Sequence, residues 1–277
     1  QFSKQYPWIE AVNISETIPG LKGKQNVLAQ LCKLATGEYF LFTDADIAVH
    51  PDWAASMVAE LEKGHDLVSG PTIVSGKSAF GYCQSLDWLF SISLLKIADI
   101  FRIPITSVGN NMAVTKTAYQ KTGGYEALSF SIVEDFRLFK AVILEGKGKF
   151  RFLYNAVMMN YATEIESADT FFHQRKRWIR GGMSGPWSAI LFLGFNLAIV
   201  PAQIAAFWFG GWKIGIFATF VRILADGISL FSETNVIRKP QFMRWFLMFE
   251  LYFHLIVIIL PFYTLLPGKI QWKGRSY

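Results

Sequence analysis

Apolar positions divide the chain into two halves of different character. Before residue 170, short apolar runs alternate with polar stretches, and most of the acidic residues lie there. After residue 186, three long apolar runs follow one another, at 187–209, 213–231 and 245–266. The first has 23 residues without a charge, enough to cross ~30 Å of hydrocarbon as a helix. We therefore expect a soluble half followed by a membrane half.

The first half alternates between strand and helix patterns. We expect strands at 8–14, 38–43 and 66–74, an extended segment at 105–114 and a strand pair within 150–161. Helices are expected after Lys24 as far as Leu34, and at 51–63, 80–100, 117–122 and 133–144. The run 39–42 is apolar on both faces, as in a central parallel strand. This order of elements predicts an α/β sheet.

The two later apolar runs carry ionisable residues: Arg222, Asp226, Glu250 and His254. Such groups inside a membrane segment have to face one another, water or protein. They also motivate a competing hypothesis, in which the chain is a non-catalytic membrane protein that binds or transports sugars.

Basic residues predict the orientation in the membrane. The loop after the second run contains Arg238, Lys239 and Arg244, which indicates a cytoplasmic loop and a cytoplasmic first half. A third full crossing would place the basic residues 269, 273 and 275 on the opposite side, against this rule. Pro261 would allow a re-entrant hairpin instead, so the sequence leaves two or three transmembrane helices open.

Charge and cysteine content exclude some classes of function. The net charge is +6, but the densest basic cluster, within 175–180, lies directly before the first apolar run. That position favours an anionic membrane surface over nucleic acid. Cys32 and Cys83 form no CxxC pair, and no histidine lies at a spacing from them that is typical of a zinc site. Neither a disulfide framework nor a zinc site is therefore indicated.

Two pairs of acidic residues are candidates for chemistry. Asp44 and Asp46 follow an apolar strand and point to the same side, at the end of the strand where open α/β sheets bind ligands. Two such carboxylates suit Mg²⁺ or Mn²⁺ holding a diphosphate, although a solvated turn gives the same pattern. Glu134 and Asp135 open a helix, where acids also stabilise free N–H groups. The alternative is that Asp135 is a general base for a hydroxyl.

A third candidate group precedes the membrane half. Gln174, Arg177 and Trp178 share one face of a helix, while the other basic residues are expected to face elsewhere. An arginine there neutralises a leaving diphosphate, and an indole stacks on a sugar or base. The competing interpretation is an amphipathic interfacial helix at 169–185, with Phe171, Phe172, Ile179 and Met183 against lipid.

The order of these motifs resembles the family 2 glycosyltransferases, including the branch of ceramide glucosyltransferases, chitin and hyaluronan synthases and bacterial cellulose synthases. The resemblance covers about residues 8–185 and rests on the ordered set Gly23-Lys24-Gln25-Asn26, Asp44-Ala45-Asp46, Gly109-Asn110-Asn111, Glu134-Asp135 and Gln174-x-x-Arg177-Trp178, with a membrane segment just after it. It implies a GT-A fold, a Rossmann-like α/β sheet for nucleotide-diphospho-sugars, over residues 1–168, followed by a membrane region at 186–277.

The resemblance also implies roles for residues. Lys24 would lie near the nucleotide diphosphate, and Asp46 with Asp44 would hold the cation. Asp135 would be the base, with Glu134 beside it. Donor and acceptor contacts would come from Gln174, Arg177 and Trp178, and acceptor contacts also from Gly109, Asn110 and Asn111. Members of the family begin with a βαβ unit that no residue before Trp8 supplies, so a chain truncated by about 60–100 residues is expected.

These residues predict an inverting, membrane-bound glycosyltransferase that uses a nucleotide-diphosphate sugar, a UDP-sugar by preference. The acceptor is expected to be a lipid-linked or glycan hydroxyl. The small number of membrane segments favours transfer of a single sugar, and a processive polysaccharide synthase remains the alternative.

Overall fold

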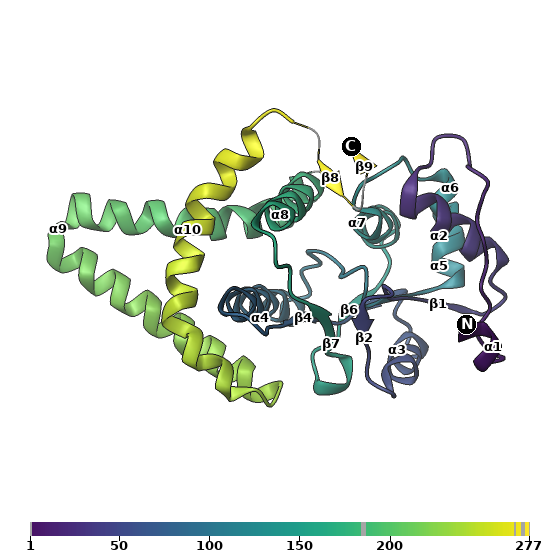
Figure 1. Ribbon diagram of the computed structural model, residues 1–277, viewed down its shortest axis with the longest axis horizontal. Helices are drawn as coiled ribbons and strands as arrows, with labels where there is room; N and C mark the ends of the chain where they lie inside the picture. Colours follow the sequence, from purple (N-terminus) through teal and green to yellow (C-terminus); the bar gives the residue numbers. More distant parts are fainter. Residues whose placement is uncertain (1, 184–186, 269, 273–274, 277) are drawn as a thin grey trace.

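The computed structural model describes residues 2–183, 187–268, 270–272 and 275–276. Strands form two small sheets in the first half, with helices packed around them, and the long helices follow (Figure 1). The strands of these two sheets are β1 (Tyr39–Phe42), β2 (Ile47–Ala48), β3 (Leu67–Ser69), β4 (Thr72–Ser75), β5 (Met112–Thr115), β6 (Phe150–Phe152) and β7 (Asn160–Thr163).

Helices connect and cover these strands. They are α1 (Phe2–Gln5), α2 (Gly23–Leu34), α3 (Trp53–Glu62), α4 (Ala79–Ile100), α5 (Lys116–Lys121), α6 (Gly124–Ala127), α7 (Glu134–Phe139), α8 (Ala168–Met183), α9 (Trp187–Val236) and α10 (Phe246–Leu265). Shorter helical turns are η1 (Lys140–Glu145), η2 (Ala156–Met158) and η3 (Pro240–Trp245), and the last strands are β8 (Gln271–Trp272) and β9 (Arg275–Ser276). The chain is thus a mixed α/β structure with two apolar helices near its C-terminus.

The sheets are mixed rather than parallel. The larger one has the order β1-β5-β3-β6, in which β5 is antiparallel to both neighbours and only β3 and β6 are parallel. The smaller one has the order β2-β7-β4. The expectation of a central parallel strand at 38–43 is wrong, because β1 pairs antiparallel with β5 at the edge of the described sheet. Phe40 and Phe42 are buried on one face of β1, and Tyr39 and Leu41 are half-buried against α3 on the other.

Three further expectations about strands are corrected by the structure. Residues 8–14 form no strand and are exposed except Ile14, so their apolar side chains do not reach the core. The strand expected at 66–74 is broken at Gly70 and Pro71 into β3 and β4, which belong to different sheets. Proline lacks the N–H that would continue the ladder. The segments within 150–161 also join different sheets and do not pair with each other.

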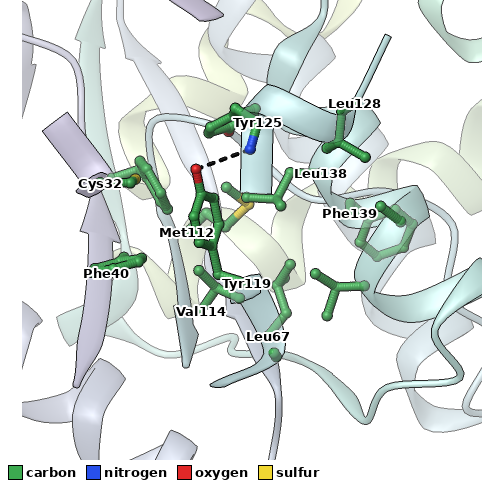
Figure 2. Close-up of a cluster of buried hydrophobic side chains, with 14 of the residues drawn as sticks. Cys32, Phe40, Leu67, Met112, Val114, Tyr119, Tyr125, Leu128, Leu138 and Phe139 are labelled. Carbon is green, nitrogen blue, oxygen red and sulfur yellow. Dashed lines mark hydrogen bonds between the residues drawn. The ribbon is translucent and has the colours of Figure 1, made fainter. Parts of the chain in front are cut away.

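An apolar cluster holds α2 and the helices α5 to η1 against the larger sheet. Phe40 of β1, Met112 and Val114 of β5, and Leu138 and Phe139 of α7 are buried in it. Tyr119 and Tyr125 lie at its centre, where the Tyr125 N–H donates to the Tyr119 hydroxyl at 2.9 Å (Figure 2). This packing fixes the position of α7, and therefore of Glu134 and Asp135, relative to β1 and Asp44.

The long helix α9 is two arms joined at Gly211. This glycine has φ 74 and ψ 174, a conformation outside the helical region that residues with a side chain rarely adopt. The arms diverge from this bend, and α10 lies across both of them (Figure 1). In the described part of the chain, Leu197–Val236 and Pro240–Leu265 are long and apolar enough to cross a membrane by length and composition.

The ionisable residues of the apolar helices lie together. Arg222 Nη2 is 2.7 Å from Asp226 Oδ2 and 2.9 Å from Glu250 Oε2, and its Nη1 is 3.0 Å from His254 Nε2. The same imidazole nitrogen is 2.9 Å from Gln203 Oε1. Because Gln203 is on the first arm of α9 and His254 on α10, this polar cluster joins both arms to α10. The groups face one another, as expected.

Candidate active site

Lys24 brings three of the predicted motifs together. It lies in the first turn of α2, which begins at Gly23 with φ 57. Its Nζ is 2.6 Å from Asp44 Oδ1 and 3.1 Å from Glu134 Oε1. The three residues come from the start of α2, the end of β1 and the start of α7. A cation and two carboxylates from distant segments therefore form one cluster at the edge of the sheet.

Burial and charge act in opposite directions in this cluster. Desolvation lowers the pKa of the Lys24 amine, but the carboxylates of Glu134 and Asp44 outweigh it, so the pKa is raised overall. Desolvation is also the largest effect on Glu134, whose side chain is 9% exposed, and together with the neighbouring Asp135 it raises the pKa of this carboxyl. Lys24 is thus a firmly protonated amine in a site that contains more acids than bases.

Asp135 is fixed by two backbone N–H groups. Its Oδ2 accepts from Gly109 N at 2.9 Å and its Oδ1 from Phe136 N at 2.8 Å. A Cβ built at Gly109 would lie 2.2 Å from Asp135 Oδ2, so only glycine permits this approach. Glu134 forms an ion pair with Lys24, and Asp135 accepts a hydrogen bond from Gly109. Stabilising the start of their own helix is therefore not the whole role of these two acids.

The turn before β5 is built from buried amides. Asn111 is completely buried; its Nδ2 donates to Pro71 O and Met158 O at 2.7 Å each, and its Oδ1 accepts from Trp53 Nε1 at 2.8 Å. Asn110 accepts through Oδ1 from the Thr72 hydroxyl. Contact of an acceptor with Asn111 would require this network to open, whereas Gly109 and Asn110 are partly exposed.

Helix α8 is docked directly beside α7. Arg177 Nη1 donates to Ile132 O at 3.0 Å, two residues before Glu134. A Cβ built at Gly181 would lie 2.5 Å from Val133 Cγ2, so the absence of a side chain allows α8 to approach this closely. The motif Gln174-x-x-Arg177-Trp178 is therefore held next to the acidic pair, with Gln174 half-buried.

The Trp178 indole lies among aromatic and basic groups. Its ring meets Trp88 edge-on, with centroids 5.2 Å apart, and the Arg175 guanidinium lies 4.6 Å from its centroid. Asp87 holds Arg175 at 2.5 Å and accepts from the Tyr252 hydroxyl at 3.2 Å. The expectation that all other basic residues face away from Trp178 is wrong, because Arg175 is three positions before it on the same helical side.

The apolar side of α8 is covered mainly by protein. Phe171 is 1% exposed and meets Phe80 and Tyr252 edge-on, and Phe172 packs on Tyr263. Met183, at the end of the helix, is 64% exposed. In this structure Phe171 is therefore a core residue between α4 and α10 rather than a contact to lipid.

The next question is whether Asp44 and Asp46 could hold a metal ion. In the described residues, no group of three or more His, Cys, Asp or Glu side chains is arranged to hold a metal ion. Asp44 is partly exposed and Asp46 is exposed. Two carboxylates at an open edge fit Mg²⁺ or Mn²⁺. Such an ion would take its remaining ligands from a diphosphate and water.

Two structural residues of the site follow directly after Lys24. Gln25 is buried; its Nε2 reaches Leu128 O at 3.3 Å, and its Oε1 accepts from Ser131 N at 2.9 Å. Asn26 accepts from Ile18 N at 2.8 Å. Polar residues on the buried face of a helix indicate that they have a buried hydrogen-bond partner. The sequence does not identify these partners, because they lie about a hundred residues away or in an irregular loop.

The chain is similar in sequence to known proteins. The model of the family described as glycosyl transferase family 21 matches residues 1–277. The chain is 21% identical over 297 residues to the poly-beta-1,6-N-acetyl-D-glucosamine synthase of Staphylococcus epidermidis, covering 92% of this chain and 70% of the relative. It is 25% identical over 166 residues to the enzyme of the same name from Staphylococcus aureus strain COL, covering 58% of this chain and 39% of that relative.

Proposed function

Because the chain belongs to glycosyl transferase family 21, we propose that it is an inverting enzyme that transfers a sugar from a nucleotide-diphosphate donor to a hydroxyl at a membrane. The convergence of Lys24, Asp44 and Glu134 at one edge, with Asp135 next to them, carries this proposal. The fold proposed is GT-A over 1–168, with α8 as the boundary element and a membrane region at 186–277.

The reaction follows from the groups at this edge. The acceptor oxygen attacks the anomeric carbon and forms the new C–O bond while the bond to the diphosphate breaks. Asp135 takes the hydroxyl proton, and its carboxylate is aimed by the Gly109 and Phe136 N–H groups. The nucleoside diphosphate leaves with the electron pair of the broken bond. A single displacement of this kind inverts the configuration at the anomeric carbon.

The leaving diphosphate needs positive charge. Lys24 is a protonated amine at the site, and Arg177 lies next to α7 with a planar guanidinium suited to phosphate oxygens. Asp44 and Asp46 would hold Mg²⁺ or Mn²⁺, which supplies further charge neutralisation when bound. Glu134 positions Lys24 through the 3.1 Å ion pair. Gln174 and Trp178 would line the pocket for donor and acceptor.

Donor and acceptor are proposed from chemistry and relatives together. The donor we propose is a UDP-sugar, and the names of the relatives make N-acetylglucosamine the first sugar to test. The acceptor would be a lipid-linked or glycan hydroxyl near Gly109, Asn110, Asn111 and Trp178. Transfer of a single sugar is proposed because the described residues contain two long apolar helices; the names of these relatives keep processive synthesis as the alternative.

The family match weighs against the transport hypothesis. Its motive was the set of ionisable residues in the apolar helices, and these contact one another across α9 and α10. Membrane insertion itself is proposed from the two long apolar helices, and a cytoplasmic site from the basic loop with Arg238, Lys239 and Arg244.

The test is an activity assay on the complete product of the gene, purified in detergent. Release of nucleoside diphosphate would be measured from several nucleotide sugars, with Mg²⁺, Mn²⁺ or EDTA and membrane lipid extract. We expect metal-dependent release that Asp46→Ala and Asp135→Asn both abolish. Asp52→Asn is the matched control, because this exposed aspartate lies outside the cluster. If no donor is turned over, or if Asp135→Asn stays active, the proposal is wrong.

Product size separates the two kinds of transfer. A single-transfer enzyme gives a product one sugar larger than its acceptor, whereas a processive enzyme gives a polymer at low turnover. Mass spectrometry of the lipid extract together with gel analysis of the aqueous phase distinguishes them.

A further inference from the structure

The apolar helix α10 contacts the soluble half near both of its ends. Before its first turn, Trp245 stacks on Tyr82, with ring centroids 5.2 Å apart and planes at 10°. In its first half, Phe249 and Phe253 pack on Phe90, at 6.4 and 5.3 Å. Tyr82 and Phe90 belong to α4, which packs on β4. The beginning of α10 therefore lies on the soluble half.

The end of α10 also lies on the soluble half. Lys176 of α8 is 4% exposed, and its Nζ donates to Leu266 O at 2.7 Å and to Tyr263 O at 3.3 Å. This amine satisfies carbonyl groups that have no partner within the helix, and its charge complements the helix C-terminus. The same α8 carries Arg177, which is bonded to Ile132 O beside the acidic pair.

These contacts are incompatible with a crossing. A helix of 20 residues that crosses the hydrocarbon places its two ends on opposite faces, ~30 Å apart. Both ends of α10 touch α4 or α8, and α8 is fixed to the acidic pair, which has to meet a water-soluble nucleotide sugar. One end cannot be on the far side unless α8 is there too.

One face of α10 is nevertheless apolar and exposed. Its exposed residues follow a helical stripe, at positions 247, 251, 255, 258, 262 and 265. The opposite face, with Phe249, Phe253 and Val257, is buried against α4 and α9. Figure 1 shows α10 lying across the arms of α9, which are themselves apolar and exposed. The stripe thus continues the surface that the arms present to lipid.

We propose that α10 lies along the membrane surface with this stripe against lipid, and that the chain after Leu266 returns to the side of the soluble half. The proposal rests on the membrane insertion proposed above but not on activity. It also places Arg275 on the side that the positive-inside rule requires.

Depth measurements on reconstituted protein test the orientation. Leu247→Cys, Leu255→Cys and Leu265→Cys place spin labels at the two ends and the middle of the stripe, and collision rates with oxygen and a nickel chelate report depth. We expect the three labels at similar depths in lipid. A crossing helix would place the label at 255 deeper than that at 247 by ~12 Å, from 8 residues at 1.5 Å each. That profile, or labels with no lipid exposure, would overturn the proposal.

Sidedness gives an independent readout. In sealed vesicles, a membrane-impermeant maleimide would be applied to Pro267→Cys, just after α10, and to Lys63→Cys, just after α3, where the native side chain is 66% exposed. Cys32 and Cys83 are buried, so the parent protein serves as the blank. We expect both variants to react from the same face. Reaction of Pro267→Cys only from the face opposite to Lys63→Cys would refute the proposal.

Discussion

Single residues decide how close the candidate base can come to its partners. Gly109 is the clearest case, since its missing side chain leaves room for Asp135 and its N–H orients that carboxylate. Asn111 has a structural role instead. Its side-chain amide hydrogen-bonds to Pro71, Met158 and Trp53. These bonds stabilise the turn that carries Gly109.

Gly109→Ala should therefore impair the reaction more than the fold. The new methyl would meet Asp135 Oδ2 at 2.2 Å and displace the carboxylate. A displacement of about 1 Å costs roughly 100-fold in rate, so we expect a loss of that order in kcat/KM. The control is Gly37→Ala, whose methyl meets no atom closer than 3.8 Å. Wild-type kcat/KM in Gly109→Ala would show that Asp135 is not the base or is not held by this contact.

At the scale of elements, the docking of α8 on α7 depends on one glycine in an adjacent pair. Gly181 faces Val133 at a distance that excludes a side chain, whereas a Cβ at Gly182 meets nothing within 4 Å. The two positions are both helical, so any general effect of alanine on helix stability is about 1 kcal/mol in the same direction for both.

Comparison of Gly181→Ala with Gly182→Ala isolates the docking contact. Gly181→Ala should push α8 away from Val133, reduce donor turnover by about tenfold or more and lower the melting temperature. Gly182→Ala should keep full activity and be neutral or slightly stabilising. Activity and thermal unfolding in detergent check this. Equal behaviour of the two variants would show that α8 does not need this close approach.

At the scale of the whole molecule, the polar cluster joins the arms of α9 to α10. The charges of Arg222, Asp226 and Glu250 are close, but Arg222 Nη2 and the two carboxylates are not aligned as hydrogen bonds. Charge neutralisation is thus the main contribution of Arg222, and its removal leaves two uncompensated carboxylates in apolar surroundings.

Arg222→Leu should destabilise the protein by about 3–5 kcal/mol, the usual cost of breaking a buried ion pair. Replacing the whole set, with Arg222→Leu, Asp226→Leu and Glu250→Leu together, should recover much of this loss because no charge stays unpaired. Unfolding in detergent measures both variants. If the triple variant is as unstable as Arg222→Leu, the cluster contributes through a specific geometry rather than through charge balance.

The sequence by itself determined the two halves, most of the helices and the motifs of the site. Apolar periodicity and a charge-free run follow from the local chemistry of neighbouring residues, so α2, α3, α4 and the apolar helices were predictable. The ordered motifs also indicated a glycosyltransferase of the family 2 type, which the match to glycosyl transferase family 21 over residues 1–277 confirms.

Only the tertiary structure decided how these elements meet. The edge position of β1, the separation of β3 from β4, the stacking of Arg175 on Trp178 and the path of α10 depend on contacts between residues far apart in the chain. Hydropathy records how apolar a segment is and not which atoms lie against its ends. The buried amine of Lys176 at the end of α10 is an example: this long-range contact opposes the crossing that a mostly apolar helix of 20 residues would suggest by itself.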